Sequence, residues 1–182
     1  MSALRFFLVL TIAFLAAIPA HAAPSAPTGD IQPNSAVAAP EWTALFDRDS
    51  GWTGADGVYT IPLTGDERFG AAGQTSTFFV FSDTFIGSVN PNGSRSGATM
   101  VNNTMARLYG SAPDPAQLTF YWGTNGSGGP ASRVLSPTPD TWYWPVDGVA
   151  LHDTLYMFNL VMRSDSAAGF AVTSIDLLRS SL

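Results

Sequence analysis

Glycine and proline interrupt every stretch of this sequence that could form a long helix, and no window keeps the 3.6-residue apolar spacing of an amphipathic helix. Short apolar runs, rich in aromatic and β-branched side chains and bounded by turn-forming residues, predict strands instead. The expected strands are residues 58–63, 77–82, 99–108, 118–122, 149–151, 155–160 and 170–177. The pattern therefore predicts an all-β fold.

Two parts of the chain share one pattern, in which an Asp-Gly pair precedes a short strand, a turn and a second, more apolar strand. The first copy is "GADGVYTIPL", followed after a loop by "TFFVFSDTF", and the second is "PVDGVALHD", running directly into "TLYMFNLVM". A repeated unit of four strands is typical of a β-propeller blade, although about 40 to 50 residues per blade is more usual. The repeat predicts a partial propeller over residues 41–182, with blade one at about 56–122 and an incomplete blade two from about 147.

A propeller blade buries its faces against its neighbours, and two blades cannot close a ring. The propeller interpretation, of the five-bladed type, therefore predicts that this sequence is the N-terminal part of a longer protein. The alternative is one complete β-sandwich of about 140 residues, which the usual size of a single domain allows. On that alternative the repeated Asp-Gly pair is a coincidence.

The N-terminus has the pattern of a secretory signal. Arg5 is followed by the apolar residues 6–18 and then by Ala20-His21-Ala22, which predicts a signal peptide over residues 1–22. The apolar run is shorter than the ~20 residues that a membrane span needs. Residues 23–40, rich in Ala, Pro, Ser and Asn, indicate a disordered linker. We therefore expect a secreted, extracellular or periplasmic protein that is not held in a membrane after cleavage.

Composition narrows the possible chemistry. The net charge is −6 and there are no basic clusters, which disfavours nucleic acid and anionic membranes as partners. The absence of cysteine excludes disulfides and thiolate chemistry. His152 is the only histidine after the signal peptide, so no multi-histidine metal site can form. Carboxylates are the main groups left for catalysis, and no cofactor is expected.

Asp56 and Asp147 are the carboxylates of the two Asp-Gly pairs. Asp-Gly is most often a hairpin turn, but in the second copy the tight turn falls at His152-Asp153, so Asp147 precedes a strand. If the first strand of each blade lines the central axis, both aspartates lie at the mouth of the axial funnel. Two carboxylates at one mouth suit glycoside hydrolysis, in which one group attacks or activates water and others tune or donate a proton.

The stretch "YWPVDGVALHDTLYMF" resembles the region of the second catalytic aspartate in five-bladed propeller glycosidases such as glycoside hydrolase family 43. "GADGVYTIPL", "TFFVFSDTFIG" and "MVNNTMARL" resemble more closely a secreted five-bladed propeller family of unknown function. The resemblance covers about residues 42–177. It implies a carbohydrate or polysaccharide as the partner and a glycosidase-like reaction.

The resemblance also implies roles for the two aspartates. Asp56 matches the general base or nucleophile, and Asp147 matches the aspartate that orients the acid and tunes its pKa. The proton donor of these hydrolases is a glutamate from a later blade, whereas Glu41 lies beside the linker and Glu67 lies in a loop. The chain as given is therefore expected to be inactive alone. The rival hypothesis is a non-catalytic glycan-binding or adhesion domain.

Four further residues are candidates for binding a sugar. Trp142 and Trp144 lie just before Asp147, and flat rings suit the apolar faces of pyranoses, although such rings also pack between sheets. Asp83 ends an expected strand and either reaches the funnel or caps a turn. Asn103, with Asn102, is polar within an expected apolar strand, and either binds a hydroxyl group or completes a buried hydrogen-bond network.

One pattern of acidic residues suggests a metal site. Asp47, Asp49 and Asp56 lie close together in a glycine-containing stretch and could hold calcium, although their spacing differs from that of an EF-hand.

Overall fold

The computed structural model describes residues 36–68 and 76–182. The predicted signal peptide and most of the predicted linker therefore lie outside the described residues. Residues Ala38–Leu182 form one compact unit. Its first element is the short helix α1, Pro40–Thr43, which begins with a proline at the helix start, where the missing N–H is not needed. No helix in the described residues is long and apolar enough to cross a membrane.

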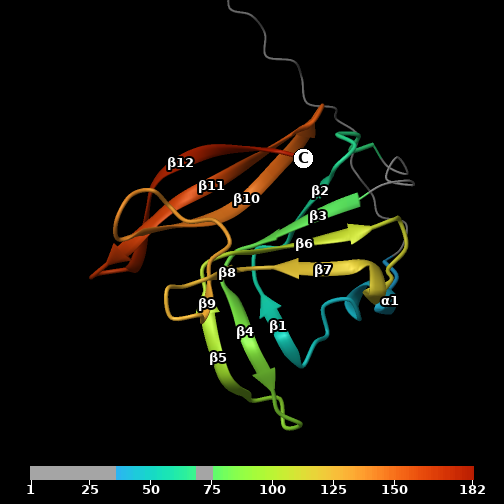
Figure 1. Ribbon diagram of the computed structural model, residues 1–182, viewed down its shortest axis with the longest axis horizontal. Coiled ribbons are helices and arrows are strands. Elements are labelled where there is room, and N and C mark those ends of the chain that lie inside the picture. The colour runs from blue at the N-terminus through green and yellow to red at the C-terminus, as the bar shows by residue number, and fades with distance from the viewer. Residues whose placement is uncertain (1–35, 69–75) are drawn as a thin grey trace, which may run out of the picture. The chain divides into compact units, whose positions relative to one another are not determined.

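The described chain is all-β, as predicted (Figure 1). Its strands are antiparallel and fall into four sheets. The strands are β1 (Ser50–Ala55), β2 (Tyr59–Pro62), β3 (Ser76–Phe81), β4 (Thr84–Val89), β5 (Arg95–Val101), β6 (Thr104–Tyr109), β7 (Leu118–Tyr121), β8 (Gly123–Thr124), β9 (Pro130–Ala131), β10 (Thr141–Leu151), β11 (Thr154–Asp165) and β12 (Gly169–Ser181). A 3-10 helix, η1 (Pro115–Gln117), precedes β7.

Four strands, in the order β2-β3-β6-β7, form what we call the first sheet. Each of the first four predicted strands contributes to it. Its strands are rich in aromatic and branched side chains, which pack well on a pleated surface. Strands β1, β4 and β5 form a separate three-stranded sheet, and β8 pairs with β9.

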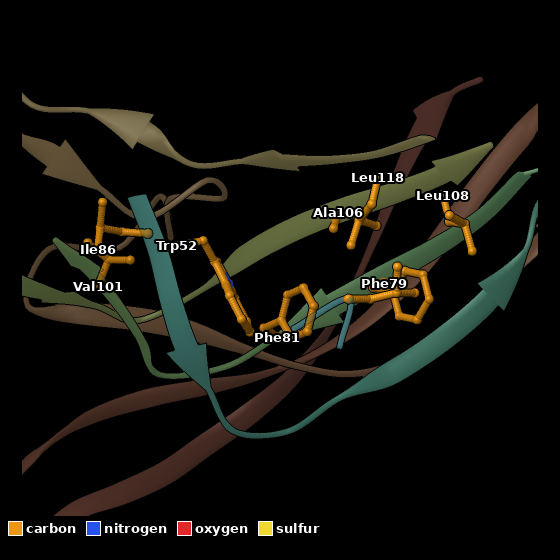
Figure 2. Close-up of a cluster of buried hydrophobic side chains, with 9 residues drawn as sticks. Trp52, Phe79, Phe81, Ile86, Val101, Ala106, Leu108 and Leu118 are labelled. Atoms are coloured by element: carbon orange, nitrogen blue, oxygen red, sulfur yellow. The ribbon is translucent and has the colours of Figure 1, made fainter. Parts of the chain in front are cut away.

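An aromatic core fills one side of the first sheet (Figure 2). Trp52 of β1 stacks on Phe120 of β7 with ring centroids 4.6 Å apart, and its ring lies 5.0 Å from that of Phe81. The indole Nε1 of Trp52 donates a hydrogen bond of 3.1 Å to the Thr104 hydroxyl, so its one polar atom is satisfied inside the core. Leu45, two residues after the end of helix α1, is fully buried in this cluster.

Strands β10, β11 and β12 form what we call the last sheet. Strand β10 lies against β2 and β3. A second apolar cluster joins the inner face of the last sheet to the first sheet, and it contains Ile61, Val80, Met105, Leu155 and Met157. The two sheets are thus held together by buried aliphatic side chains.

The outer face of the last sheet carries exposed apolar side chains. Phe158 and Leu177, which pair directly across β11 and β12, are 40% and 56% exposed, and Ile175 is 65% exposed. No sheet in the described residues closes into a ring or barrel. The fold class is therefore all-β, and the propeller arrangement is treated below as a proposal.

Two strand predictions were wrong. The predicted strand 99–108 is two strands, because the chain bends at Asn102-Asn103 between β5 and β6, which belong to different sheets. Asp147 does not precede its strand, because β10 begins at Thr141 and pairs with β11 along its whole length. A bulge between Pro145 and Asp147 accommodates the proline, which has no N–H for the ladder. The turn at His152-Asp153 between β10 and β11 is as predicted.

Candidate functional site

Asp83 lies in the turn between β3 and β4 and joins the first sheet to the last. The indole Nε1 of Trp144, on β10, donates a hydrogen bond of 2.8 Å to Oδ1 of Asp83. The adjacent Ser82 hydroxyl donates a bond of 3.2 Å to the carbonyl of Pro145, also on β10. Two neighbouring residues of one turn therefore fix β10 and its tryptophan in place.

Asp56 is held beside Asp83 by the backbone. Its amide donates a hydrogen bond to the Asp83 carbonyl at 3.1 Å, and its carbonyl accepts one from the Ser82 amide at 3.0 Å. Gly57 follows with φ of +58°, and a Cβ at this position would lie 2.8 Å from the Ser82 hydroxyl. Glycine is therefore required at position 57 by the left-handed conformation and by the close approach of the two turns.

The environment raises the pKa of the Asp83 carboxyl. Partial burial is the main cause, since it disfavours the charged form, and the negative charge of Asp56 acts in the same direction. The hydrogen bond from Trp144 opposes both effects by stabilising the carboxylate. Asp83 is thus a carboxyl that holds its proton more strongly than an exposed aspartate does.

Asp147 lies on the exposed side of β10, beside the bulge. Its Oδ1 accepts a hydrogen bond of 2.7 Å from the amide of Gly148. Within the residues that the structure describes, no hydrogen bond joins Asp147 to Asp56 or Asp83. The structure therefore pairs Asp56 with Asp83, a residue that we predicted to bind substrate, and leaves Asp147 separate in hydrogen bonding.

Trp142 and Trp144 form an edge-to-face pair with ring centroids 6.2 Å apart, and Phe170 of β12 lies 4.8 Å from Trp144. Trp142 lines a hollow of about 880 Å³ together with Asn102, Asp140 and Arg163. The Trp142 Nε1 atom is buried and has no hydrogen-bond partner among the described residues. An aromatic ring, an amide and charged groups are thus gathered around one hollow. Sequence reasoning missed Asp140 and Arg163, which lie in a loop and on the exposed part of β11.

Asn103 is fully buried. Its Nδ2 donates to the carbonyls of Val134 and Tyr143 at 2.9 and 3.0 Å, and its Oδ1 accepts from the Val134 amide at 2.8 Å. The amide group is therefore occupied by backbone partners, which favours the buried-network alternative. Asn102, which lines the hollow, is the more accessible of the two asparagines.

The acids suggested as calcium ligands do not gather around one point. In residues 36–68 and 76–182, no group of three or more His, Cys, Asp or Glu side chains is arranged to hold a metal ion. Asp47 and Asp49 lie on an exposed stretch before β1.

Residues 40–182 match the model of a protein family described as a domain of unknown function, DUF5005. The chain belongs to this family. No curated protein matches it significantly. A solved structure described as "a putative hydrolase from Bacteroides ovatus ATCC 8483" is similar, with a TM-score of 0.64 and 21% identity over 78% of this chain. The match covers 38% of that protein's chain, so this DUF5005 chain spans well under half of its length.

Proposed function

We propose that this DUF5005 chain is part of a secreted protein that acts on carbohydrate, with its site around Asp56, Asp83 and Trp144. The observation that carries the proposal is the hydrogen bond between Trp144 and Asp83, beside Asp56. An aromatic ring next to two carboxylates suits a sugar, whose ring has an apolar face and whose hydroxyl groups donate hydrogen bonds.

Asp56 is exposed and serves as the general base or nucleophile. Asp147 keeps the supporting role that the resemblance to propeller glycosidases implies, although the only hydrogen-bond partner of its side chain among the described residues is the Gly148 amide. Asp83 binds a sugar hydroxyl through Oδ2, because Trp144 occupies Oδ1 and no described residue donates to Oδ2. The proton donor is a glutamate from a later blade, as the resemblance implies, whereas Glu41 and Glu67 lie in helix α1 and in the loop after β2.

In this proposal, the first sheet is the first blade of a five-bladed propeller and the last sheet is part of the second blade. Support comes from their sequential antiparallel strands, from the contact of β10 with β2 and β3, and from the fold match to part of a larger chain. The exposed apolar outer face of the last sheet is the surface that a third blade would cover. A β-sandwich is the alternative arrangement. It predicts that residues 41–182 alone unfold in one cooperative transition as a monomer, whereas exposed blade faces predict aggregation.

Hydrolysis of aryl glycosides and polysaccharides by the complete protein is the direct test. Asp56→Asn should lower the rate by about 10²–10⁴-fold, because it removes the base or nucleophile. Asp153→Asn is the matched control, since Asp153 is exposed in the turn between β10 and β11. Full activity of Asp56→Asn would show that Asp56 is not the general base or nucleophile.

The hollow beside Trp142 favours a second candidate, a glycan-binding domain without catalysis. The unpartnered Nε1 of Trp142 would donate to a sugar oxygen, and the neighbouring ring would support the sugar face. This candidate predicts saturable binding of oligosaccharides without turnover at any pH. Trp142→Ala should weaken that binding roughly tenfold, and calorimetry measures the loss. Trp122→Ala is a control, because Trp122 packs against the aromatic core and not in the hollow.

A further inference from the structure

A separate cavity lies between the two packed sheets, away from the residues of the proposed sugar site. Phe78, Met105 and Tyr121 of the first sheet line one side, and Leu155, Met157 and Leu178 of the last sheet line the other. Its volume is about 580 Å³, which is in the range of small-molecule sites. The lining side chains come from β3, β6 and β7 of the first sheet and from β11 and β12 of the last sheet.

Arginine gives this otherwise apolar cavity its charge. Arg107 lies two residues after Met105 on β6, and residues two apart on a strand share a face. Both side chains therefore point from the first sheet towards the last. Arg133, from the segment after β9, also lines the cavity, whereas no lining residue carries a carboxylate. The only ion pair among the described residues is that of Arg68 with Asp66, so neither cavity arginine has an acidic partner there. Arg179 also lines the cavity, but it follows Leu178 on β12, so its side chain leaves the strand on the opposite face of the last sheet.

Arg107 has an unmet hydrogen-bonding requirement. Its guanidinium stacks on Tyr109, with Cζ 4.5 Å from the ring centroid. Its Nε atom is buried and has no hydrogen-bond partner among the described residues. A buried N–H without a partner is costly, and a guanidinium offers a planar pair of donors that matches a carboxylate or sulfonate.

We propose that this cavity binds a small organic anion, with a carboxylate or sulfonate on Arg107 and Arg133 and an apolar ring between the two sheets. The anion supplies the missing acceptor for Nε of Arg107. The ring fills space lined by Phe78, Met157 and Leu178, where it is removed from water. The site is independent of the proposed sugar site, because the two share no residue.

The test uses the full chain and the fluorescent probe 8-anilinonaphthalene-1-sulfonate, which combines a sulfonate with apolar rings. We expect one saturable site, competition by benzoate, and binding at least tenfold weaker for the uncharged analogue N-phenyl-1-naphthylamine. Arg107→Gln and Arg133→Gln should each weaken probe binding about tenfold. Leu178→Trp should abolish binding by filling the cavity without changing charge. Arg95→Gln is the matched charge control and should change affinity less than twofold, because Arg95 of β5 stacks on an aromatic ring, as Arg107 does, but lies outside the cavity.

The exposed apolar face of the last sheet is the competing location for such a probe. Ile175→Ser lies on that face and not in the cavity, so it should leave probe binding unchanged. Equal affinity for the uncharged analogue, unchanged binding in both arginine variants, loss of binding in Ile175→Ser, or no saturable binding would each overturn the proposal. Unfolding midpoints of all variants, measured by circular dichroism, separate loss of the site from loss of the fold.

Discussion

The first and last sheets are both antiparallel and both rich in apolar side chains, but they are covered differently. The first sheet packs the aromatic core on one face and the last sheet on the other. The last sheet buries only its inner face, whereas Phe158, Ile175 and Leu177 face outward. Similar strand patterns therefore do not mean similar burial, because the partner of each face decides what its apolar side chains contribute to stability.

The largest expected difference between the two sheets is in side-chain truncation. Phe81→Ala should lower the free energy of unfolding by about 3–5 kcal/mol, because Phe81 is fully buried among Trp52, Phe46 and Phe120 and the cavity cannot close. Ile175→Ala should change it by less than about 0.5 kcal/mol, since Ile175 is already in contact with water. Urea denaturation measures both values. Similar losses would mean that the outer face is covered in solution.

The contact between the sheets is the next test. A Cβ added to Gly148 of β10 would lie 2.7 Å from the Tyr156 carbonyl and still closer to the Ile61 side chain. Gly148→Ala should therefore destabilise the chain by about 1–3 kcal/mol through overpacking between the sheets. Gly126→Ala is the control, because a Cβ there meets nothing within 4 Å. A neutral Gly148→Ala would show that the sheets do not approach this closely.

Tyr143 tests the inner face of the last sheet. Its hydroxyl donates a hydrogen bond of 2.6 Å to Asp176, and burial, followed by this bond and the nearby charge, raises its pKa to about 12. Tyr143→Phe should cost about 1 kcal/mol. Since the folded pKa is raised, the wild type should lose stability as the pH rises from about 10 towards 12, and the variant should lack this loss. Urea denaturation of both proteins across that pH range measures the difference. Equal pH profiles would contradict the raised pKa of Tyr143.

The smallest expected effect concerns Asp83 and Asp165, whose pKa values are shifted in opposite directions. The pKa of Asp83, between the sheets, is raised mainly by burial, whereas the pKa of Asp165, in the turn between β11 and β12, is lowered by the amides of Ala168 and Ala167. Asp83 therefore favours folding at low pH, and this contribution falls as the pH rises from the ordinary carboxyl value to its folded pKa; Asp165 does the reverse.

The variant Trp144→Phe tests the difference between Asp83 and Asp165. It removes the hydrogen bond to Oδ1 of Asp83, so the pKa of Asp83 should rise further while that of Asp165 stays constant. Carboxyl carbon chemical shifts followed by NMR across pH 2–8, roughly the range of perturbed carboxyls, report both groups. A fall in the pKa of Asp83 would contradict the hydrogen bond seen here.

The sites show where sequence reasoning succeeded and where it failed. Gly57 could be predicted, because an Asp-Gly pair marks a turn and the glycine adopts a left-handed conformation. The start of β10 at Thr141 could not be predicted, because a proline such as Pro145 inside a strand argues against continuous hydrogen bonding to the next strand unless a bulge is present. The sequence left open whether Asn103 binds a sugar or completes a buried network, because its partners, the carbonyls of Val134 and Tyr143, lie far away in the sequence.

The sequence by itself determined that the chain is all-β, where most of its strands lie, and that carboxylates are its main reactive groups. These properties depend on local spacing and residue type, which act within a few residues. Only the tertiary structure decided that Trp144 binds Asp83, that Asp56 lies beside it, and that Arg107 faces a cavity between two sheets. Such pairings depend on strand register and sheet packing, and a shift of one residue would turn each side chain to the opposite face.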